Sequence, residues 1–474
     1  MTRALVLSSF LAASLAACFN PSYDEPLCDE QRRCPADLAC NADGVCVATL
    51  APDARALDAS GLDADSDAVD APTDGFATDA TDATDATDAT DATDATDATD
   101  ATDATDASPI VEDIDASPIV EDIVHLRAID EALGTGDLTV TGTLTIVTGS
   151  PPTSNPALPS GVTMSVVPQD GPGSSVVVLR VRNLTIEPSA TLRATGLFPL
   201  VIVTESATVS GWIDVAAVGS TPGAGMGPPL GDPGVGGNGS HGGNFADSGG
   251  GGGAFGTWGG DGGDSNPVPG GPGGVAHGVA SLDVLEPGSS GGASYFPSGS
   301  NNCTRGNPGA AGGAVQLYAR TSIMMSVDRG GITAGGGGGR GGDACDNPFN
   351  WLAGHGGGSG GAIYLQAPTV VAGLLLANGG GGGSGGGGNG NGRAGGDAAR
   401  ASRGGTGGSP SGQYSYEGGE GASSAIPARA GRDSNDNGYG NGGGGGGGVG
   451  RIHIRSHNPP TMGNTSPAPT TSTY

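Results

Sequence analysis

Two stretches of the chain are near-copies of each other: residues 312–319 read GGAVQLYA, and residues 360–367 read GGAIYLQA. A looser third copy, GVGRIHI, runs from Gly448 to Ile454. In each copy a glycine lead-in is followed by alternating apolar residues, which is the pattern of a half-buried strand. The first two copies then lead through a second short apolar piece into a polyglycine block. A unit that repeats strand, turn, strand and glycine loop indicates a solenoid.

Short alternating segments of the same kind precede the first copy. They are separated by tight Pro-Ser, Glu-Ser or Ser-Gly corners, and no Asn-Gly hairpin signal stands between them. Tight corners without hairpin turns favour a parallel β-helix over a β-sandwich. The sequence therefore predicts an all-β fold, a parallel β-helix or solenoid, with strands at Leu138–Ile146, Val176–Val181, Leu184–Ile186, Ala190–Ala194, Leu200–Val203, Ala207–Val209 and Trp212–Val215.

Three glycine-rich insertions interrupt this pattern, at residues 219–313, 335–361 and 379–448. Glycine loses more conformational freedom on ordering than any other residue, so such blocks are either flexible linkers or chains packed too closely for a side chain. The ordered alternative is a set of polyglycine-II helices, in which extended backbones hydrogen-bond to neighbours in three directions. Cys303 and Cys345 lie in the first two insertions. A disulfide between them would staple those insertions together, which favours the ordered alternative.

The negative charge of the chain is concentrated in its N-terminal part. The formal net charge is −30, and residues 1–124 hold 4 Arg against 28 Asp and Glu, which gives −24. The remaining residues are nearly neutral, so the basic surface of a nucleic-acid-binding protein is missing. The chain also has no lysine, which excludes a P-loop lysine, a Schiff-base lysine and a Ser-Lys dyad. These counts argue against nucleic acid as a partner.

The first residues have the features of a lipoprotein signal peptide. Arg3 supplies a positive charge, and Ala4–Ala13 form a mostly apolar run too short to span a bilayer. The segment 1–17 leads into Leu-Ala-Ala-Cys, which resembles the lipobox of bacterial lipoproteins. That resemblance implies that Cys18 carries lipid and anchors the chain to a membrane. The next residue is Phe19 rather than Asp, which by the sorting rule of Gram-negative lipoproteins implies the outer membrane.

Residues 18–48 form a small cysteine-rich module. Cys28, Cys34, Cys40 and Cys46 follow one another at even spacing. An exported chain meets an oxidising compartment, so two disulfides are expected here, and the three possible pairings stay open. The spacing lacks the paired C-x2-C of a zinc site.

Residues 49–124 are predicted to be a disordered acidic tether. The run from Thr78 to Ala107 consists of Thr-Asp-Ala triplets, which are poor in apolar groups and rich in like charge. A folded glycine-rich domain is expected at residues 125–455. The tail at residues 456–474 is rich in Pro, Thr and Ser and shows no period, so it is expected to be disordered.

No arrangement of residues points to a catalytic site, and no cofactor is expected apart from a weak calcium signal. GGDGGD at residues 259–264 and GGRGGD at residues 338–343 match the first part of the calcium-binding repeat GGxGxDxUx. The large apolar residue of that repeat is missing in both places. Chance similarity is therefore favoured over a calcium site, whose ligands would be Asp261, Asp264 and Asp343.

Two aromatic and two amide residues form a possible sugar-contact row. If the near-copies are neighbouring strands, Gln316, Tyr318, Tyr364 and Gln366 stand in outward-facing rows. Such a row can contact sugars, although on a β-surface it more often reflects packing between strands. Paired carboxylates at matching positions are missing, so the two-carboxylate chemistry of glycosidases lacks its parts.

The layout as a whole resembles the glycine-rich surface lipoproteins of myxobacteria and related deltaproteobacteria. These share the lipobox, the cysteine-rich leader, the acidic tether and GGA[IV]xLxA repeats with polyglycine, and the resemblance covers nearly the whole chain. It implies a lipid-anchored outer-membrane protein on the cell surface. The expected function is non-enzymatic display of the solenoid for adhesion or matrix contact. The alternatives are a polysaccharide-binding or polysaccharide-active β-helix, and a calcium-stabilised surface module.

Overall fold

The computed structural model describes residues 38–40, 46–48, 122–171, 173–226, 232–242, 246–294, 306–343, 352–387, 390–398, 400–434 and 440–474. The chain divides into two units, residues 1–110 and 111–474. In the first unit β1 (Leu38–Cys40) and β2 (Cys46–Ala48) pair in antiparallel fashion. All other described elements belong to the second unit.

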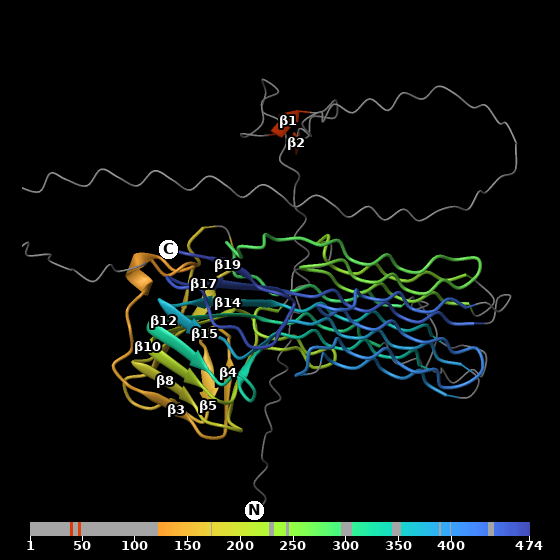
Figure 1. Ribbon diagram of the computed structural model, residues 1–474. Coiled ribbons are helices and arrows are strands. Elements are labelled where there is room, and N and C mark those ends of the chain that lie inside the picture. Colours follow the sequence, from red (N-terminus) through yellow and green to blue (C-terminus); the bar gives the residue numbers. More distant parts are fainter. Residues whose placement is uncertain are drawn as a thin grey trace, which may run out of the picture. The chain divides into compact units, whose positions relative to one another are not determined.

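Two β-sheets form the base of the second unit, and nearly all of their strands run parallel (Figure 1). The only described helical turn is η1 (Ala128–Asp130). The first sheet contains β3 (Leu138–Val140), β6 (Thr163–Val167), β7 (Val176–Arg180), β8 (Asn183–Ile186), β10 (Leu200–Val209), β12 (Ala314–Met325), β14 (Ala362–Gln366), β15 (Thr369–Val371), β17 (Arg451–Arg455) and β19 (Thr470–Ser472). The second sheet contains β4 (Thr143–Val147), β5 (Thr153–Asn155), β9 (Thr191–Thr195), β11 (Trp212–Asp214), β13 (Gly331–Thr333), β16 (Leu374–Leu376) and β18 (Thr465–Ser466).

From β8 to β18, each return of the chain adds to the first sheet and then to the second. β12 lies between β10 and β14, with Leu317 beside both Ile202 and Leu365. β13 lies in the same way between β11 and β16. The two near-copies are therefore neighbouring strands in register, and the third copy follows as β17. The predicted all-β, largely parallel organisation is confirmed. The antiparallel pairs of β5 with β4 and of β6 with β7 were not predicted.

Apolar side chains from both sheets meet in one buried core. Leu184, Leu317 and Ile363 come from the first sheet, and Ile213 and Leu375 come from the second. They point inward together because successive side chains along a strand face opposite sides of the sheet. Each fully buried side chain of this kind stabilises the fold by roughly 1.5–3 kcal/mol. A second apolar cluster lies on the other face of the first sheet and includes residues from 123–126 and 282–285.

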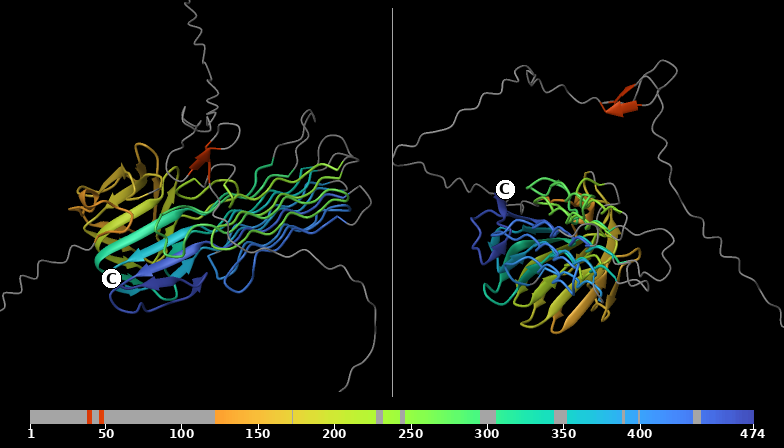
Figure 2. Two further views of the ribbon diagram at one scale, coloured as in Figure 1. Left: turned by 90° about the horizontal axis from the view of Figure 1, so that it is seen from above. Right: turned by 90° about the vertical axis from the view of Figure 1, so that its right-hand side faces the viewer.

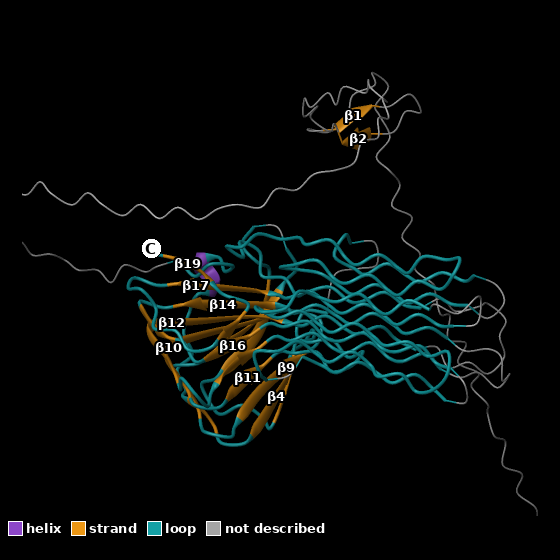
Figure 3. Ribbon diagram, turned by 45° about the vertical axis from the view of Figure 1, so that its right-hand side comes forward, coloured by secondary structure: helices purple, strands orange, loops and turns teal. Residues whose placement is uncertain are grey.

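The glycine-rich loops between strands project from one end of the sheets and run side by side (Figures 1 and 2). They are extended but belong to neither sheet, and Figure 3 shows them as loops. We call them the glycine bundle, which consists of segments 232–242, 246–257, 259–275, 288–294, 306–313, 334–343, 352–361, 377–387, 390–398, 404–408, 417–422, 429–434 and 440–450.

Backbone hydrogen bonds in the bundle repeat every third residue. In segment 246–257, three successive amides donate to three different neighbouring segments, and the next three amides donate to the same segments in the same order. The acceptor segment is 259–275 for Gly249 and Gly252, 352–361 for Gly250 and Gly253, and 232–242 for Gly251 and Ala254. Backbone amides and carbonyls buried away from water must be paired, and here they are paired between segments rather than within a sheet.

Four segments lie at the centre of the bundle, namely 246–257, 352–361, 377–387 and 440–450. All residues of 352–361 are buried. The end-on view in Figure 2 shows the segments packed around one another. Segment 352–361 hydrogen-bonds to six others: 246–257, 288–294, 306–313, 334–343, 377–387 and 440–450.

Neighbouring backbones in the bundle approach too closely for any side chain. A Cβ atom placed on Gly252 would lie 1.9 Å from the carbonyl oxygen of Gly446, and one on Gly356 would lie 1.9 Å from that of Gly251. Only glycine allows this approach. Of the two alternatives for the insertions, close packing accounts for their described segments.

The structure extends the domain at both ends. Residues 456–474, expected to be disordered, contain β18 and β19, which pair with β16 and β17. These strands show no apolar alternation, because backbone pairing and polar side-chain contacts, such as those of His453 with Thr470 and Ser472, hold them in place. At the other end, Ile123 is 2% exposed, so the domain begins before residue 125.

Candidate binding surface

On one part of the first sheet's outer face, along β3, β8, β15 and the second halves of β10 and β12, the outward side chains are exposed or half-buried. Because these strands pair in register, their outward side chains form two rows that run across the strands. We call them the polar rows. The first consists of Asp137, Asn183, Ser206, Ser322 and Thr369, and the second of Thr139, Thr185, Thr208, Met324, Val371 and Thr461.

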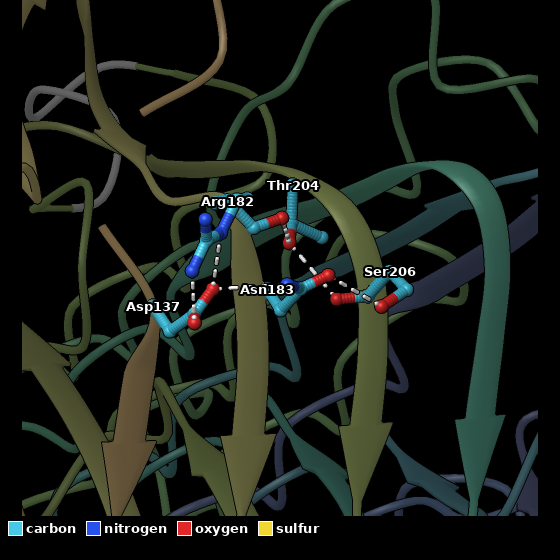
Figure 4. Close-up of polar contacts among 5 residues, drawn as sticks. All are labelled: Asp137, Arg182, Asn183, Thr204 and Ser206. Atoms are coloured by element: carbon cyan, nitrogen blue, oxygen red, sulfur yellow. Dashed lines mark hydrogen bonds and ion pairs between the residues drawn. The ribbon is translucent and has the colours of Figure 1, made fainter. Parts of the chain in front are cut away.

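Hydrogen bonds hold the start of the first row in one orientation (Figure 4). Arg182 donates to both carboxylate oxygens of Asp137, from Nε to Oδ1 at 2.8 Å and from Nη2 to Oδ2 at 2.5 Å. Asn183 donates from Nδ2 to the same Oδ1 at 2.9 Å, and the hydroxyl of Ser206 donates to Oδ1 of Asn183 at 2.9 Å. The hydrogen bonds from Arg182 and Asn183 lower the pKa of Asp137 to about 2, so its carboxylate stays charged.

A bulge in β10 sets the corner beside this network. The register between β10 and β12 shifts between Thr204 and Ser206. The buried hydroxyl of Thr204 lies 3.0 and 2.9 Å from the backbone oxygens of Arg182 and Ser206 and can donate its one proton to either. The side chain at the bulge, Glu205, faces Arg320 with 3.4 Å between Oε2 and Nη1. The corner therefore carries two carboxylates and two guanidinium groups, and its net charge is zero.

A groove of about 400 Å³ lies at the N-terminal end of the polar rows. It is formed by residues 138–144 and by the loop at residues 156–159. Thr139 belongs both to the groove lining and to the second polar row. The remaining lining combines threonine hydroxyls with leucine and proline side chains, so hydroxyl and apolar groups stand next to each other.

The sequence did not mark the polar rows as a site, because outward-facing Thr, Ser and Asn on a strand are typical of any solvated surface. A signal was nonetheless available. The triplets Leu138-Thr139-Val140, Leu184-Thr185-Ile186 and Ala207-Thr208-Val209 have the same pattern, and aligning them places three threonines in one row.

The residues of the expected sugar-contact row lie together, but beneath another part of the chain. In the paired strands β12 and β14, Gln316 is beside Tyr364 and Tyr318 is beside Gln366. Both glutamines are 0% exposed, and Tyr318 and Tyr364 are 6% and 3% exposed. Burial also raises the pKa of Tyr364 to about 12. These side chains form a buried layer rather than an open row.

Hydrogen bonds fasten the covering segment to this buried layer. The amide of Gln366 accepts at Oε1 from the backbone of Val124 at 3.1 Å and from Nε2 of Gln316 at 3.2 Å. The ring of His125 lies 3.0 Å from Oε1 of Gln316 and 2.5 Å from the carbonyl oxygen of Leu282. Burial lowers the pKa of His125. The layer thus attaches the start of the domain to the first sheet.

Charged side chains stand in stripes on one side of the glycine bundle. Glu417 and Glu420 lie on one segment and Arg429 and Arg432 on its neighbour, each pair three residues apart. Nε of Arg429 lies 3.4 Å from Oε2 of Glu420, and Nη1 of Arg432 lies 3.9 Å from Oε2 of Glu417. They line a shallow groove of about 310 Å³. These ion pairs are largely exposed, so each contributes about 0–1 kcal/mol to stability.

The three weak calcium candidates have protein partners. Oδ1 of Asp261 accepts a hydrogen bond from the backbone of Gly273 at 2.7 Å, and Oδ1 of Asp264 accepts one from Gly270 at 2.8 Å. Both carboxylate oxygens of Asp343 face Nη2 of Arg340, at 3.0 and 3.1 Å. The carboxylates thus cap bundle segments and form an ion pair.

Most of the cysteines lie outside the described residues. This holds for Cys18, the predicted lipidation site, and for the disulfide candidates Cys28, Cys34, Cys303 and Cys345. Cys40 and Cys46 are directly paired backbone positions of β1 and β2. Lipidation and the disulfides therefore stay predictions.

Comparison with known proteins adds no further assignment. Within the described ranges, no group of three or more His, Cys, Asp or Glu could hold a metal ion. No helix in those ranges is long and apolar enough to cross a bilayer. No family model, curated protein or solved structure matches the chain.

Proposed function

We propose that the chain is a non-enzymatic lipoprotein of the cell envelope that displays a rigid domain outside the outer membrane for adhesion or matrix contact. The proposed anchor is lipid on Cys18, and the proposed spacer is the acidic tether at residues 49–124. The two sheets are proposed to be a β-solenoid, and the glycine bundle a set of polyglycine-II helices.

The observation that carries this proposal is the glycine bundle. Ordering the backbone of one residue costs about 1–2 kcal/mol, and glycine lies at the upper end. A flexible spacer avoids that cost, whereas the described bundle segments are ordered by hydrogen bonds in three directions. Such cross-linking resists bending in every direction across the bundle. It supports a structural role, in which the function depends on the shape and stiffness of the bundle rather than on a reactive centre.

Labelling of intact cells that produce the protein tests the proposal. We expect an antibody against residues 125–474 to label the domain without permeabilisation. In a Cys18→Ser variant, which cannot be lipidated, the labelling of intact cells should be lost. Labelling only after permeabilisation would place the domain in the periplasm and refute the adhesive role.

Polysaccharide binding is the second candidate function, and the open polar rows favour it. They combine hydroxyl, amide and carboxylate groups with the apolar side chains of Met324 and Val371. Such groups suit a hydroxyl-rich polymer better than an apolar partner.

A further inference from the structure

We infer that the polar rows bind a neutral, extended polysaccharide whose chain runs across the strands of the first sheet. This inference rests on the proposed matrix contact and names the component that is contacted. It concerns the open face along β3, β8, β10, β12 and β15, and not the buried layer of Tyr and Gln on the same sheet.

The spacing of side chains along each polar row matches the repeat of an extended glycan. Paired strands lie about 4.8 Å apart. Because the register is maintained across five strands, equivalent side chains repeat at that interval. The interval is close to the length of one sugar unit in an extended glycan. A chain lying across the strands can therefore present successive sugars to successive strands.

The first polar row offers both hydrogen-bond donors and acceptors. Sugar hydroxyls both donate and accept hydrogen bonds, so they are matched by groups that do either. Asp137 offers carboxylate lone pairs, and Arg182 and Asn183 offer N–H groups whose orientation the network already fixes. The hydroxyl of Ser206 donates to Asn183, which leaves its lone pairs as acceptors. Groups held in place before binding lose little freedom when a ligand arrives.

Charge and apolar character select the class of glycan. Asp137 and Arg182 neutralise each other, and Glu205 and Arg320 do the same, so the corner attracts neither a polyanion nor a polycation. In the second row hydroxyls give way to Met324, which is 44% exposed, and to the half-buried Val371. These side chains suit the C–H faces of a sugar ring. A neutral polymer with extended geometry fits this combination better than a uronate-rich one.

A length series of oligosaccharides tests the inference on the full-length chain. Calorimetric titration with cellobiose, cellotetraose and cellohexaose should show affinity rising with length, because a longer ligand reaches more strands. Cellohexaose should bind at least about tenfold more tightly than maltohexaose, which coils, or a galacturonate hexamer, which is charged. Equal affinity for all three hexamers, or no binding of cellohexaose, would overturn the inference.

Matched variants locate the site. Thr208→Arg places a long charged side chain in the middle of the second row and should weaken cellohexaose binding about tenfold. Thr153→Arg makes the same change at an exposed position of β5 in the second sheet and should leave binding unchanged. If Thr208→Arg proves unstable, Thr369→Arg at the end of the first row replaces it.

Unchanged cellohexaose binding in a folded row variant would refute the assignment. The binding measurement does not depend on where the domain lies in the cell. A chain that binds cellohexaose but is not labelled on intact cells keeps the glycan site and loses the proposed location.

Discussion

At the scale of single residues, the glycine bundle follows a rule of three. Surface segments such as 259–264 and 417–420 carry a larger residue at every third position. Asp261, Asp264 and Glu417 are exposed and Glu420 is half-buried, whereas the glycines of these segments are buried or half-buried. Central segments such as 442–448 have glycine at every position and are wholly buried. A three-residue period turns one residue in three toward solvent at the surface, whereas at the centre every residue faces a neighbouring backbone.

Substitution of a central glycine tests this rule. Gly252→Ala would bring a Cβ atom within 1.9 Å of a backbone oxygen, and the backbone cannot yield as a flexible side chain can. We expect a loss of at least about 3 kcal/mol in the free energy of unfolding, measured by denaturant titration. Gly142→Ala is the matched control, because nothing lies within 4 Å of its Cβ position. A similar loss in both variants would contradict close packing in the bundle.

His355 gives the bundle a dependence on pH. Burial lowers its pKa from 6.5 to about 4, and its Nδ1 accepts a hydrogen bond from the backbone of Ser294 at 3.1 Å, as a neutral ring can. The unfolded chain therefore binds a proton more readily than the folded one. The stability due to neutral His355 is fully present above pH 6.5 and is lost as the pH falls toward 4.

The expected size of this loss is roughly 2–3 kcal/mol between pH 7 and pH 4.5. His355→Gln removes the titration, so the stability difference between the two proteins isolates it from other groups, including Asp247, whose pKa is raised to about 6 by burial. Parallel pH profiles for the wild type and the variant would show that His355 titrates normally.

At the scale of elements, one buried carboxylate joins the bundle to the second sheet. Asp214 in β11 lies 2.9 Å from Nη1 of Arg193 in β9 and 2.7 Å from Nη2 of Arg400, which follows a bundle segment. Arg400 also lies over the ring of Trp212, 4.9 Å from its centre. The carboxylate is 6% exposed, so removing it leaves two cations around a partly buried site.

We expect Asp214→Ala to lower the free energy of unfolding by about 3 kcal/mol. Amide hydrogen exchange should accelerate first in residues 390–398, because their connection to the second sheet is lost. Asp328→Ala changes an exposed carboxylate and should stay within about 0.5 kcal/mol of the wild type. Unaltered exchange in residues 390–398 would show that Asp214 does not hold the bundle.

The sequence predicted the strands that bury apolar side chains and missed those that do not. Strands with apolar alternation, such as β8 and β12, were found because their inward side chains leave a pattern of period two. β19 was missed because it is composed of Thr and Ser and is held by backbone pairing and side-chain hydrogen bonds, neither of which leaves an apolar pattern. The buried layer of Gln316 and Tyr364 was expected to face outward. No strand pattern reveals that residues 122–126 and 280–286 cover it.

At the scale of the whole molecule, the sheets and the bundle are one structure rather than a domain with appendages. Each bundle loop leaves one strand and returns to a later one (Figure 3). The register of the paired strands therefore aligns the loops, and the hydrogen bonds between the loops in turn hold the strands side by side. Composition alone could not predict this. Ninety-five glycines suit a flexible linker as well as a packed bundle, and only the hydrogen bonding between distant segments distinguishes the two.

The position of segment 440–450 at the centre of the bundle has a consequence for the order of assembly. Its amides donate to residues about 200 positions earlier, such as Gly250, so the middle of the bundle forms only after these distant parts of the chain have come together. Contacts this remote slow folding, because the intervening chain must be gathered first. Until segment 440–450 is in place, some of the backbone groups of the segments around it lack their hydrogen-bond partners. The bundle therefore becomes stiff in a single late step, when segment 440–450 joins its neighbours, rather than one loop at a time.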